Sequence, residues 1–188
     1  MEQQPRPSPE TEPEIRPRIY VASLSDYNAG RLHGTWIDAT QDPEGINEAV
    51  QRMLATSPQL FAEEWAIHDY EGFGYARLSE YSSFETVSRV AQGIETHGDA
   101  FGAWIAYSGD DSEENLDKFE EAYLGRWDSL RDYAEQLAED LGITEDVIPE
   151  EHRPYISIDI DRLVRDLEID LVVAKAADGG IHVFNPYV

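Results

Sequence analysis

The alternation of apolar and polar residues predicts an α+β fold made of short elements. Pro43 opens a predicted helix in which Ile46, Ala49, Val50 and Met53 recur at helical spacing. Apolar and β-branched residues instead gather in short runs that predict strands, at residues 19–24, 35–39 and 64–68. A turn-rich stretch at 26–30 separates the first two strands. These elements predict a small α+β domain at the N-terminal end of the chain.

Helical patterns dominate the middle of the chain. Phe84, Val87 and either Val90 or Ala91 share one stripe of a predicted helix, and a second short helix is predicted after Gly98 and Asp99. Ser112 is a candidate N-cap for a third helix. The middle segment is therefore predicted to be helical.

The C-terminal part mixes helix and strand again. A long helix is predicted over residues 128–141, where Ser129 and Asp132 resemble a capping box and Gly142 follows the last turn. Asp178, Gly179 and Gly180 predict a hairpin turn. The strands predicted for this part are residues 155–158, 171–175 and 181–184.

These patterns predict three small domains in series and no transmembrane segment. The predicted boundaries place an α+β domain at residues 18–78, a helical domain at 79–125 and a second α+β domain at 126–188. Residues 1–17 contain five prolines among polar residues, so this tail is expected to be disordered.

Charge restricts the functions that such a fold can have. The chain of 188 residues carries 39 Asp and Glu against 14 Lys and Arg, a formal net charge of −25. Such a surface repels nucleic acids and acidic membranes and attracts basic grooves. The chain has no cysteine and no apolar segment typical of a secretory signal, so we expect a cytoplasmic protein without disulfides.

Carboxylates are densest between Asp110 and Glu151, where 16 of them face three Lys and Arg, a local charge of −13. In the helix predicted at 128–141, the residues expected to be buried are Leu130, Ala134, Leu137 and Leu141. A second face of that helix carries Asp128, Asp132, Glu135 and Glu139. The preceding helix is predicted to repeat this arrangement, with Leu116, Phe119 and Tyr123 buried beside a row of Glu113, Asp117 and Glu120.

This arrangement favours a protein partner that normally binds DNA. Like charges three or four residues apart each cost roughly 0.2–0.5 kcal/mol, so the row on the longer helix opposes folding by about 1 kcal/mol. Duplex DNA presents about one negative charge per 1.7 Å of axis, so the excess charge of this chain matches about 43 Å of duplex. Solubility or adaptation to high salt is the alternative explanation of an acidic surface.

Enzymatic sites find little support in the sequence. His68 and Asp69 lie near Glu63 and Glu64 but match no familiar spacing of metal ligands or acid–base groups. The acidic residues 110–114 lack the glycine of a calcium-binding loop, and Gly72-Phe73-Gly74 lacks the third glycine of a dinucleotide-binding loop. We therefore expect no catalytic residues, no cofactor and no bound metal, with a carboxylate-based metal enzyme as the alternative.

Several strings spread along the chain resemble the ArdA-type antirestriction proteins. These strings are IYVASLSDYNAG at 19–30, LHGTWIDA at 32–39, EWAIHDYE at 64–71, FEEAYLGRWDS at 119–129 and HVFN at 182–185. The resemblance implies an elongated dimer of small domains whose carboxylates resemble bent B-form DNA and block type I restriction-modification enzymes. It also implies that the antirestriction stretch corresponds to residues 123–137 and that the C-terminal domain takes part in dimerisation.

The sequence and the resemblance together predict the residues that bind a type I enzyme in place of DNA. Tyr123 and Trp127 are candidate contacts of a homodimer, and no direct binding of nucleic acid or membrane is expected. An acidic interaction or chaperone module for another basic DNA-binding protein is the alternative function. The carboxylates predicted to imitate phosphates are Asp110, Asp111, Glu113, Glu114, Asp117, Glu120, Glu121, Asp128, Asp132, Glu135, Glu139 and Asp140.

Overall fold

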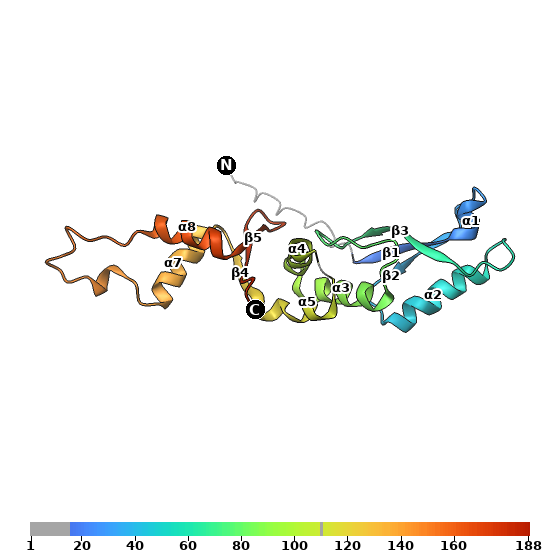
Figure 1. Ribbon diagram of the computed structural model, residues 1–188, viewed down its shortest axis with the longest axis horizontal. Coiled ribbons are helices and arrows are strands. Elements are labelled where there is room, and N and C mark those ends of the chain that lie inside the picture. The colour runs from blue at the N-terminus through green and yellow to red at the C-terminus, as the bar shows by residue number, and fades with distance from the viewer. Residues whose placement is uncertain (1–15, 110) are drawn as a thin grey trace, which may run out of the picture. The chain divides into compact units, whose positions relative to one another are not determined.

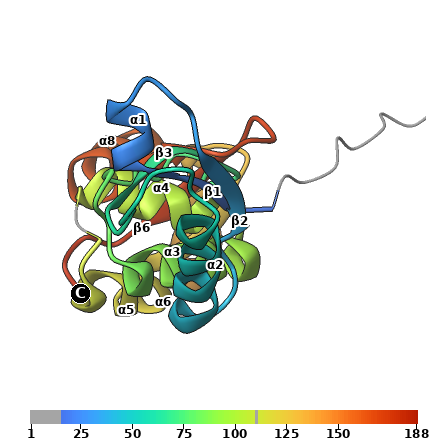
Figure 2. The same ribbon diagram turned by 90° about the vertical axis from the view of Figure 1, so that its right-hand side faces the viewer.

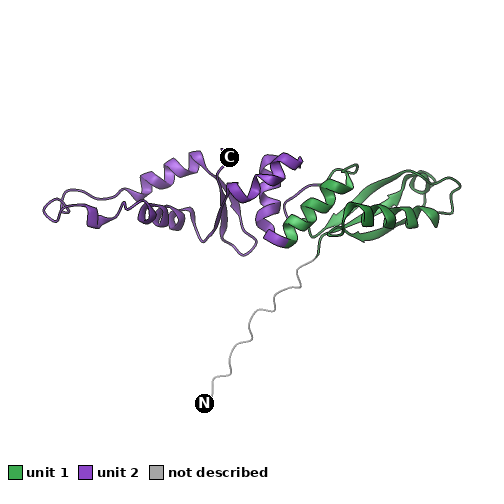
Figure 3. Ribbon diagram, turned by 90° about the horizontal axis from the view of Figure 1, so that it is seen from below, with its two compact units in different colours: residues 1–73, 78–95 green, residues 74–77, 96–188 purple. Residues whose placement is uncertain are grey.

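The computed structural model describes residues 16–109 and 111–188, which divide into two compact units (Figure 3). Unit 1 runs to Phe73 and includes Leu78–Glu95, and unit 2 contains Gly74–Arg77 and Thr96–Val188. The described part of the chain has eight α-helices and two three-stranded sheets, which confirms the mixed α+β class. The division into three domains stays a prediction. The predicted disorder of residues 1–15 lies outside the described residues.

Unit 1 is built on an antiparallel sheet with β1 (Arg18–Ser23) in the middle (Figures 1 and 2). Its neighbours are β2 (Gly34–Asp38) and β3 (Trp65–Glu71). Ile19 and Val21 alternate along β1 and are fully buried, as expected for a sheet with one face on the core. The three predicted strands are confirmed, with small shifts of their ends.

Three helices complete this unit. α2 (Pro43–Ala55) begins at the predicted proline, and its N-cap Asp42 accepts a hydrogen bond from the backbone N–H of Gly45 at 2.7 Å. α3 (Phe84–His97) is also confirmed. A short helix, α1 (Leu24–Asn28), replaces part of the expected turn because Ser23 caps it by accepting from the N–H of Asp26.

Unit 2 contains an antiparallel sheet of order β4-β6-β5 together with five helices and a 3-10 turn. The predicted hairpin is confirmed, with Gly179 at a φ of +94°. The core gathers Trp104, Phe119 and Phe184, whose rings lie within 6.2 Å of one another where they are paired. The elements of this unit are α4 (Asp99–Ser108), α5 (Glu113–Asp117), α6 (Phe119–Ala122), β4 (Tyr123–Trp127), α7 (Leu130–Asp140), η1 (Glu145–Val147), α8 (Ile160–Asp170), β5 (Val172–Lys175) and β6 (Ile181–Phe184).

The third strand of this sheet was predicted at the wrong place. Residues 155–158 form no strand, and Tyr155 and Ile156 are largely exposed. β4 pairs with β6 instead and takes the position of third strand. Gly125, at a φ of +110°, accompanies a register shift in β4, and such an irregular strand lacks a clear period-two pattern.

Two helical predictions also need correction. The helix expected to carry Leu116, Phe119 and Tyr123 is divided at Lys118 into α5 and α6, and Tyr123 belongs to β4. α8 was not predicted, although Asp159 caps it by accepting from the backbone N–H of Arg162 at 2.9 Å. Among the described residues, no helix combines the length and the apolar character that crossing a bilayer requires.

Candidate partner-binding surface

The predicted acidic row lies only in part on α7, because the helix begins at Leu130 and not at residue 128. Asp132, Glu135 and Glu139 belong to the helix, and Asp128 lies just before its N-cap; the four are called the α7 row below. Ser129 caps the helix, accepting from the backbone N–H of Asp132 at 3.2 Å and donating its hydroxyl proton to the Asp132 carboxylate at 2.6 Å. Ala134 and Ala138 are buried on the inner face. The four carboxylates of the row, Asp128, Asp132, Glu135 and Glu139, are all exposed. One face of α7 therefore packs while the other presents acids.

The apolar stripe of α7 is shallower than predicted. Leu130 and Leu137 are only half-buried, and Leu141, which lies just after the helix, is 64% exposed. Asp140 is exposed, and its carboxylate accepts a hydrogen bond from the side-chain amide of Gln136 at 2.9 Å. Ala134 and Ala138 are the buried side chains of α7, and the two half-buried leucines add to the apolar area that holds the helix.

A second group of predicted acids lies on α5 and α6. Leu116 and Phe119 are buried and anchor the two helices. The exposed acids of this pair are Glu113, Glu114, Asp117, Glu120 and Glu121. Asp111 precedes α5 and is half-buried, and Asp110 lies outside the described residues. The structure thus keeps these carboxylates on helices, although on two short ones.

Basic side chains lie near two of these acids. Lys118 Nζ lies 3.2 Å from Glu114 one helical turn away, and His97 Nε2 lies 4.0 Å from Glu120. Unit 2 has 22 Asp and Glu against eight Lys and Arg in its described residues, a net charge of −14, compared with 12 against five, or −7, in unit 1. The carboxylate excess is therefore concentrated in the unit that carries all the predicted site residues.

α8 supplies acids that the sequence reasoning missed. It packs against α7, and it contributes the exposed acids Asp161, Asp166, Glu168 and Asp170 in addition to its cap Asp159. The signal was present in the sequence, because Asp159 is a typical N-cap and Leu163, Leu167 and Leu171 are spaced by four residues. The acidic surface of unit 2 therefore includes α5, α6, α7 and α8.

The two candidate dimer contacts lie on β4, at the edge of the sheet. The ring of Tyr123 stacks on Phe119, and burial, with a smaller effect of the Asp99 charge, raises the pKa of its hydroxyl. Trp127 donates its indole N–H to the carbonyl of Leu124 at 3.1 Å and packs edge-on against Tyr133. Both side chains are half-buried within their own unit, and their role between two copies stays a prediction.

The residues considered for a metal or acid–base site are spread over the surface around β3. His68 and Asp69 are exposed on β3, where His68 packs edge-on against Tyr27, and Glu63 and Glu64 are exposed before the strand. Over residues 16–109 and 111–188, no group of three or more His, Asp or Glu side chains is arranged to hold a metal ion. Gly72 and Gly74 follow β3 at positive φ and precede a loop, not a helix.

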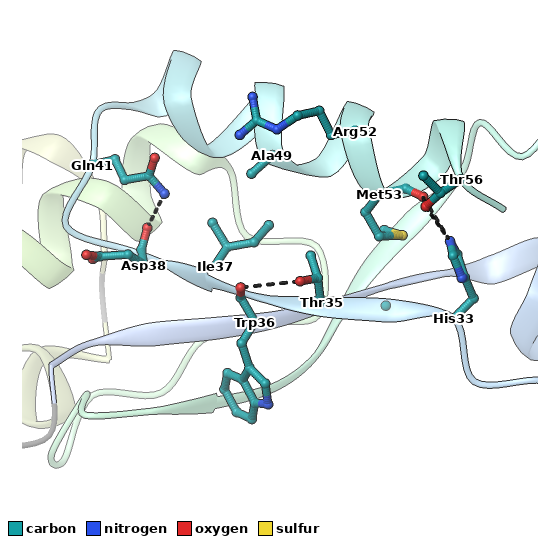
Figure 4. A pocket seen from close by; sticks show the side chains of 11 residues that line it. His33, Thr35, Trp36, Ile37, Asp38, Gln41, Ala49, Arg52, Met53 and Thr56 are labelled. Atoms are coloured by element: carbon teal, nitrogen blue, oxygen red, sulfur yellow. Dashed lines mark hydrogen bonds between the residues drawn. The ribbon is translucent and has the colours of Figure 1, made fainter.

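An open hollow of about 500 Å³ in unit 1 lies between β2 and α2 (Figure 4). His33 Nε2 lies 2.8 Å from the Met53 carbonyl oxygen at one end, and the Gln41 amide donates to the Asp38 carbonyl at the other. The His33 ring and the Gln41 amide thus contact backbone carbonyl oxygens at opposite ends of the hollow and do not converge on a common point.

A comparison with known families gives a match over most of the chain. A family model described as antirestriction protein (ArdA) matches residues 19–181, a range that includes most of both units. The comparison with curated proteins gives no significant match. Membership of this family supports an antirestriction function and suggests restriction-modification enzymes as partners. Because the match extends over most of the chain, the chain belongs to the ArdA family of antirestriction proteins.

Proposed function

We propose that this protein inhibits type I restriction-modification enzymes without catalysis, by occupying their DNA-binding groove in place of DNA. The observation that carries the proposal is α7, where one face packs through Ala134 and Ala138 and the other presents a row of exposed carboxylates. A helix fixes the spacing of its side chains, so these charges resemble a charged backbone more closely than acids on a flexible segment would.

The charge density of α7 alone is lower than that of DNA. Asp132, Glu135 and Glu139 are three and four residues apart, so they lie about 5 Å apart along the helix axis. One DNA strand presents a phosphate about every 3.4 Å of axis. The acids of α5, α6 and α8 are therefore needed to raise the density, and the proposal assigns them to the same surface.

An acidic surface of this kind favours fast association with a basic groove. Complementary charge steers the encounter and makes the association rate sensitive to salt. Each exposed contact is weak by itself. The affinity is therefore expected to be spread over many carboxylates instead of a single anchor.

We further propose that the protein acts as a homodimer that associates through unit 2. This unit exposes several large apolar side chains, and such groups favour protein contacts. They lie after α7, before α8 and on α8, and they are Leu141, Ile143, Val147, Tyr155, Ile156 and Ile169. Tyr123 and Trp127, on the exposed edge strand of the same unit, are the predicted additional contacts.

Competition with DNA tests the proposed function. A fluorescently labelled duplex with the recognition sequence is bound to a type I methyltransferase core, and the full-length protein is added while anisotropy is followed. We expect displacement of the duplex together with a stable complex of protein and enzyme. Retention of the duplex at saturating protein would contradict the proposal. If the protein instead bound an unrelated basic protein and not the type I enzyme, the acidic interaction module would be favoured.

A further inference from the structure

Two arginines lie within the acidic surface of unit 2, and each contacts two carboxylates. Arg126 belongs to β4 and Arg131 to the first turn of α7. We propose that these arginines are positioning residues that fix the orientation of carboxylates used for inhibition. This inference rests on the proposed function, because it explains how the carboxylate surface is ordered before the enzyme binds.

Arg126 connects the hairpin turn to the start of α7. Its guanidinium contacts Asp178 through both oxygens, with Nη2 at 2.9 Å from Oδ2 and Nε at 3.4 Å from Oδ1, while Nη1 contacts Asp128. Asp178 is itself held, because its Oδ1 accepts from the backbone N–H of Gly180 at 3.1 Å. The first carboxylate of the α7 row is therefore attached to a side chain that the turn already orients.

The chain leaves space for this guanidinium. A Cβ on Gly180 would lie 2.7 Å from both Cζ and Nη2 of Arg126 and 2.6 Å from the backbone oxygen of Trp127. Real Cβ atoms do not approach other atoms this closely, so a larger residue at position 180 would require both the Trp127 backbone and the arginine side chain to shift. Gly180 lies in the bend just before β6, and its lack of a side chain allows this close approach of β4 and its arginine.

Arg131 connects α7 to α8. One guanidinium nitrogen contacts Asp161 in the first turn of α8, and the other lies 3.6 Å from Glu135 one turn further along α7. α7 buries only Ala134 and Ala138, and α8 buries no side chain completely. The two helices pack together, and the arginine adds a directional contact that orients the acids of one helix relative to those of the other.

Stability alone does not explain these contacts. All four carboxylates that the arginines contact are more than half exposed, and exposed ion pairs contribute little to folding. The planar guanidinium, however, binds two acceptors in a fixed geometry that an ammonium group does not reproduce. Side chains ordered before binding lose less entropy when the partner arrives. The contacts therefore favour binding more than they favour folding.

Net charge and positioning predict opposite effects of the same substitution. Arg126→Gln and Arg131→Gln each make the protein more acidic, so an inhibitor that depended on net charge alone would bind the basic groove more tightly. If the arginines position carboxylates, the same variants bind more weakly despite their extra negative charge. Arg131→Lys keeps the net charge and removes the two-pronged contact.

The test measures displacement of labelled duplex from a type I methyltransferase core by each full-length variant. The matched control is Arg52→Gln in unit 1, which removes an exposed arginine that pairs with Glu48 at 3.5 Å within one helix. We expect Arg126→Gln and Arg131→Gln each to need roughly threefold or more protein than wild type for half displacement. Side chains in direct contact are coupled strongly enough for an effect of this size. Arg131→Lys is expected to lie between wild type and Arg131→Gln, and the control is not expected to weaken displacement.

Circular dichroism and the thermal midpoint establish that each variant is folded. If a Gln variant fails to fold, displacement of the duplex by Arg131→Lys is compared with displacement by wild type, because these two proteins have equal net charge. Displacement by the Gln variants that equals or exceeds wild type, or a Lys variant equal to wild type, would overturn the positioning role while the proposed function stands. Failure of the wild-type protein to displace the duplex would overturn both.

Discussion

The Tyr123 hydroxyl lies 3.1 Å from Nδ1 of His182 and joins the edge strand β4 to the middle strand β6. His182 is buried, and its Nε2 lies 3.1 Å from Asp99 Oδ1 at the beginning of α4. Asp99 in turn accepts from the backbone N–H of Ala177 at 2.6 Å. A chain of polar contacts thus connects α4, the hairpin and the first residue of the predicted antirestriction stretch.

Removing the Tyr123 hydroxyl should destabilise unit 2 without changing its charge. Tyr123→Phe leaves Nδ1 of a buried imidazole without its partner, so we expect a loss of roughly 0.5–1.5 kcal/mol in the free energy of unfolding. Denaturant titration followed by circular dichroism measures it. Tyr133→Phe is the matched control. The Tyr133 ring packs on Trp127 and is kept in this variant, so removal of its hydroxyl should cost less. Equal losses in the two variants would contradict a role for the Tyr123–His182 contact.

The cap of α7 gives a second prediction. Ser129→Ala removes the oxygen that accepts from the N–H of Asp132, and N-cap losses of this kind cost about 1 kcal/mol. Because α7 buries only two alanines, fraying of its first turn should also disorder Asp132. We expect faster amide hydrogen exchange in the first turn of α7, whereas Ser129→Asn, another good capping residue, should keep the protection. Unchanged exchange in the alanine variant would show that the cap is dispensable.

The hairpin carboxylate should titrate abnormally. A hydrogen bond from Arg126 is the main reason why the pKa of Asp178 lies below its ordinary value of 3.8, and a hydrogen bond from the backbone N–H of Gly180 lowers it further. A depressed pKa in the folded state stabilises the fold above the unfolded pKa, and this contribution is lost as the pH falls through the folded value. NMR titration of the Asp178 carboxyl should therefore give a midpoint below 3.8 that rises in Arg126→Gln. A midpoint that the arginine substitution leaves in place would contradict this contact.

Single carboxylates should matter little to inhibition. Exposed ion pairs each contribute about 0–1 kcal/mol, so Glu139→Gln is expected to change half-displacement of DNA by less than about fivefold. Glu120→Gln on α6 is the parallel test at a second place on the surface, and the same small effect is expected there. Complete loss of inhibition from either substitution would contradict a distributed surface and point to one essential contact.

The sequence predicted most regular elements because their local signals agree with the fold. Pro43 with Asp42, Ser112 and Ser129 each mark the beginning of a helix that the structure contains. The hairpin around Gly179 needed the same local chemistry, a glycine at positive φ between two β-type runs. Capping and turn residues act over a few positions, so sequence alone identifies them.

The elements that the sequence missed depend on tertiary pairing. β4 forms because residues 123–127 pair with β6 more than fifty positions later, and Gly125 interrupts their alternation. Tyr155 was expected in a strand because of its apolar neighbours, but residues 155–158 pair with no strand in the described structure. The acids of α7 were found from helical spacing, whereas those of α8, Asp161 among them, required the helix itself to be recognised.

The measurement that tests the central claim most directly compares two variants of equal charge. One neutralises the α7 row through Asp128→Asn, Asp132→Asn, Glu135→Gln and Glu139→Gln, and the other neutralises four glutamates before Arg16, through Glu2→Gln, Glu10→Gln, Glu12→Gln and Glu14→Gln. Both change the net charge from −25 by the same amount. If carboxylates in fixed positions imitate phosphates, the α7 variant loses most of its ability to displace DNA from the type I enzyme and the other variant keeps it. Equal loss in the two variants would show that total charge, and not its arrangement, produces inhibition.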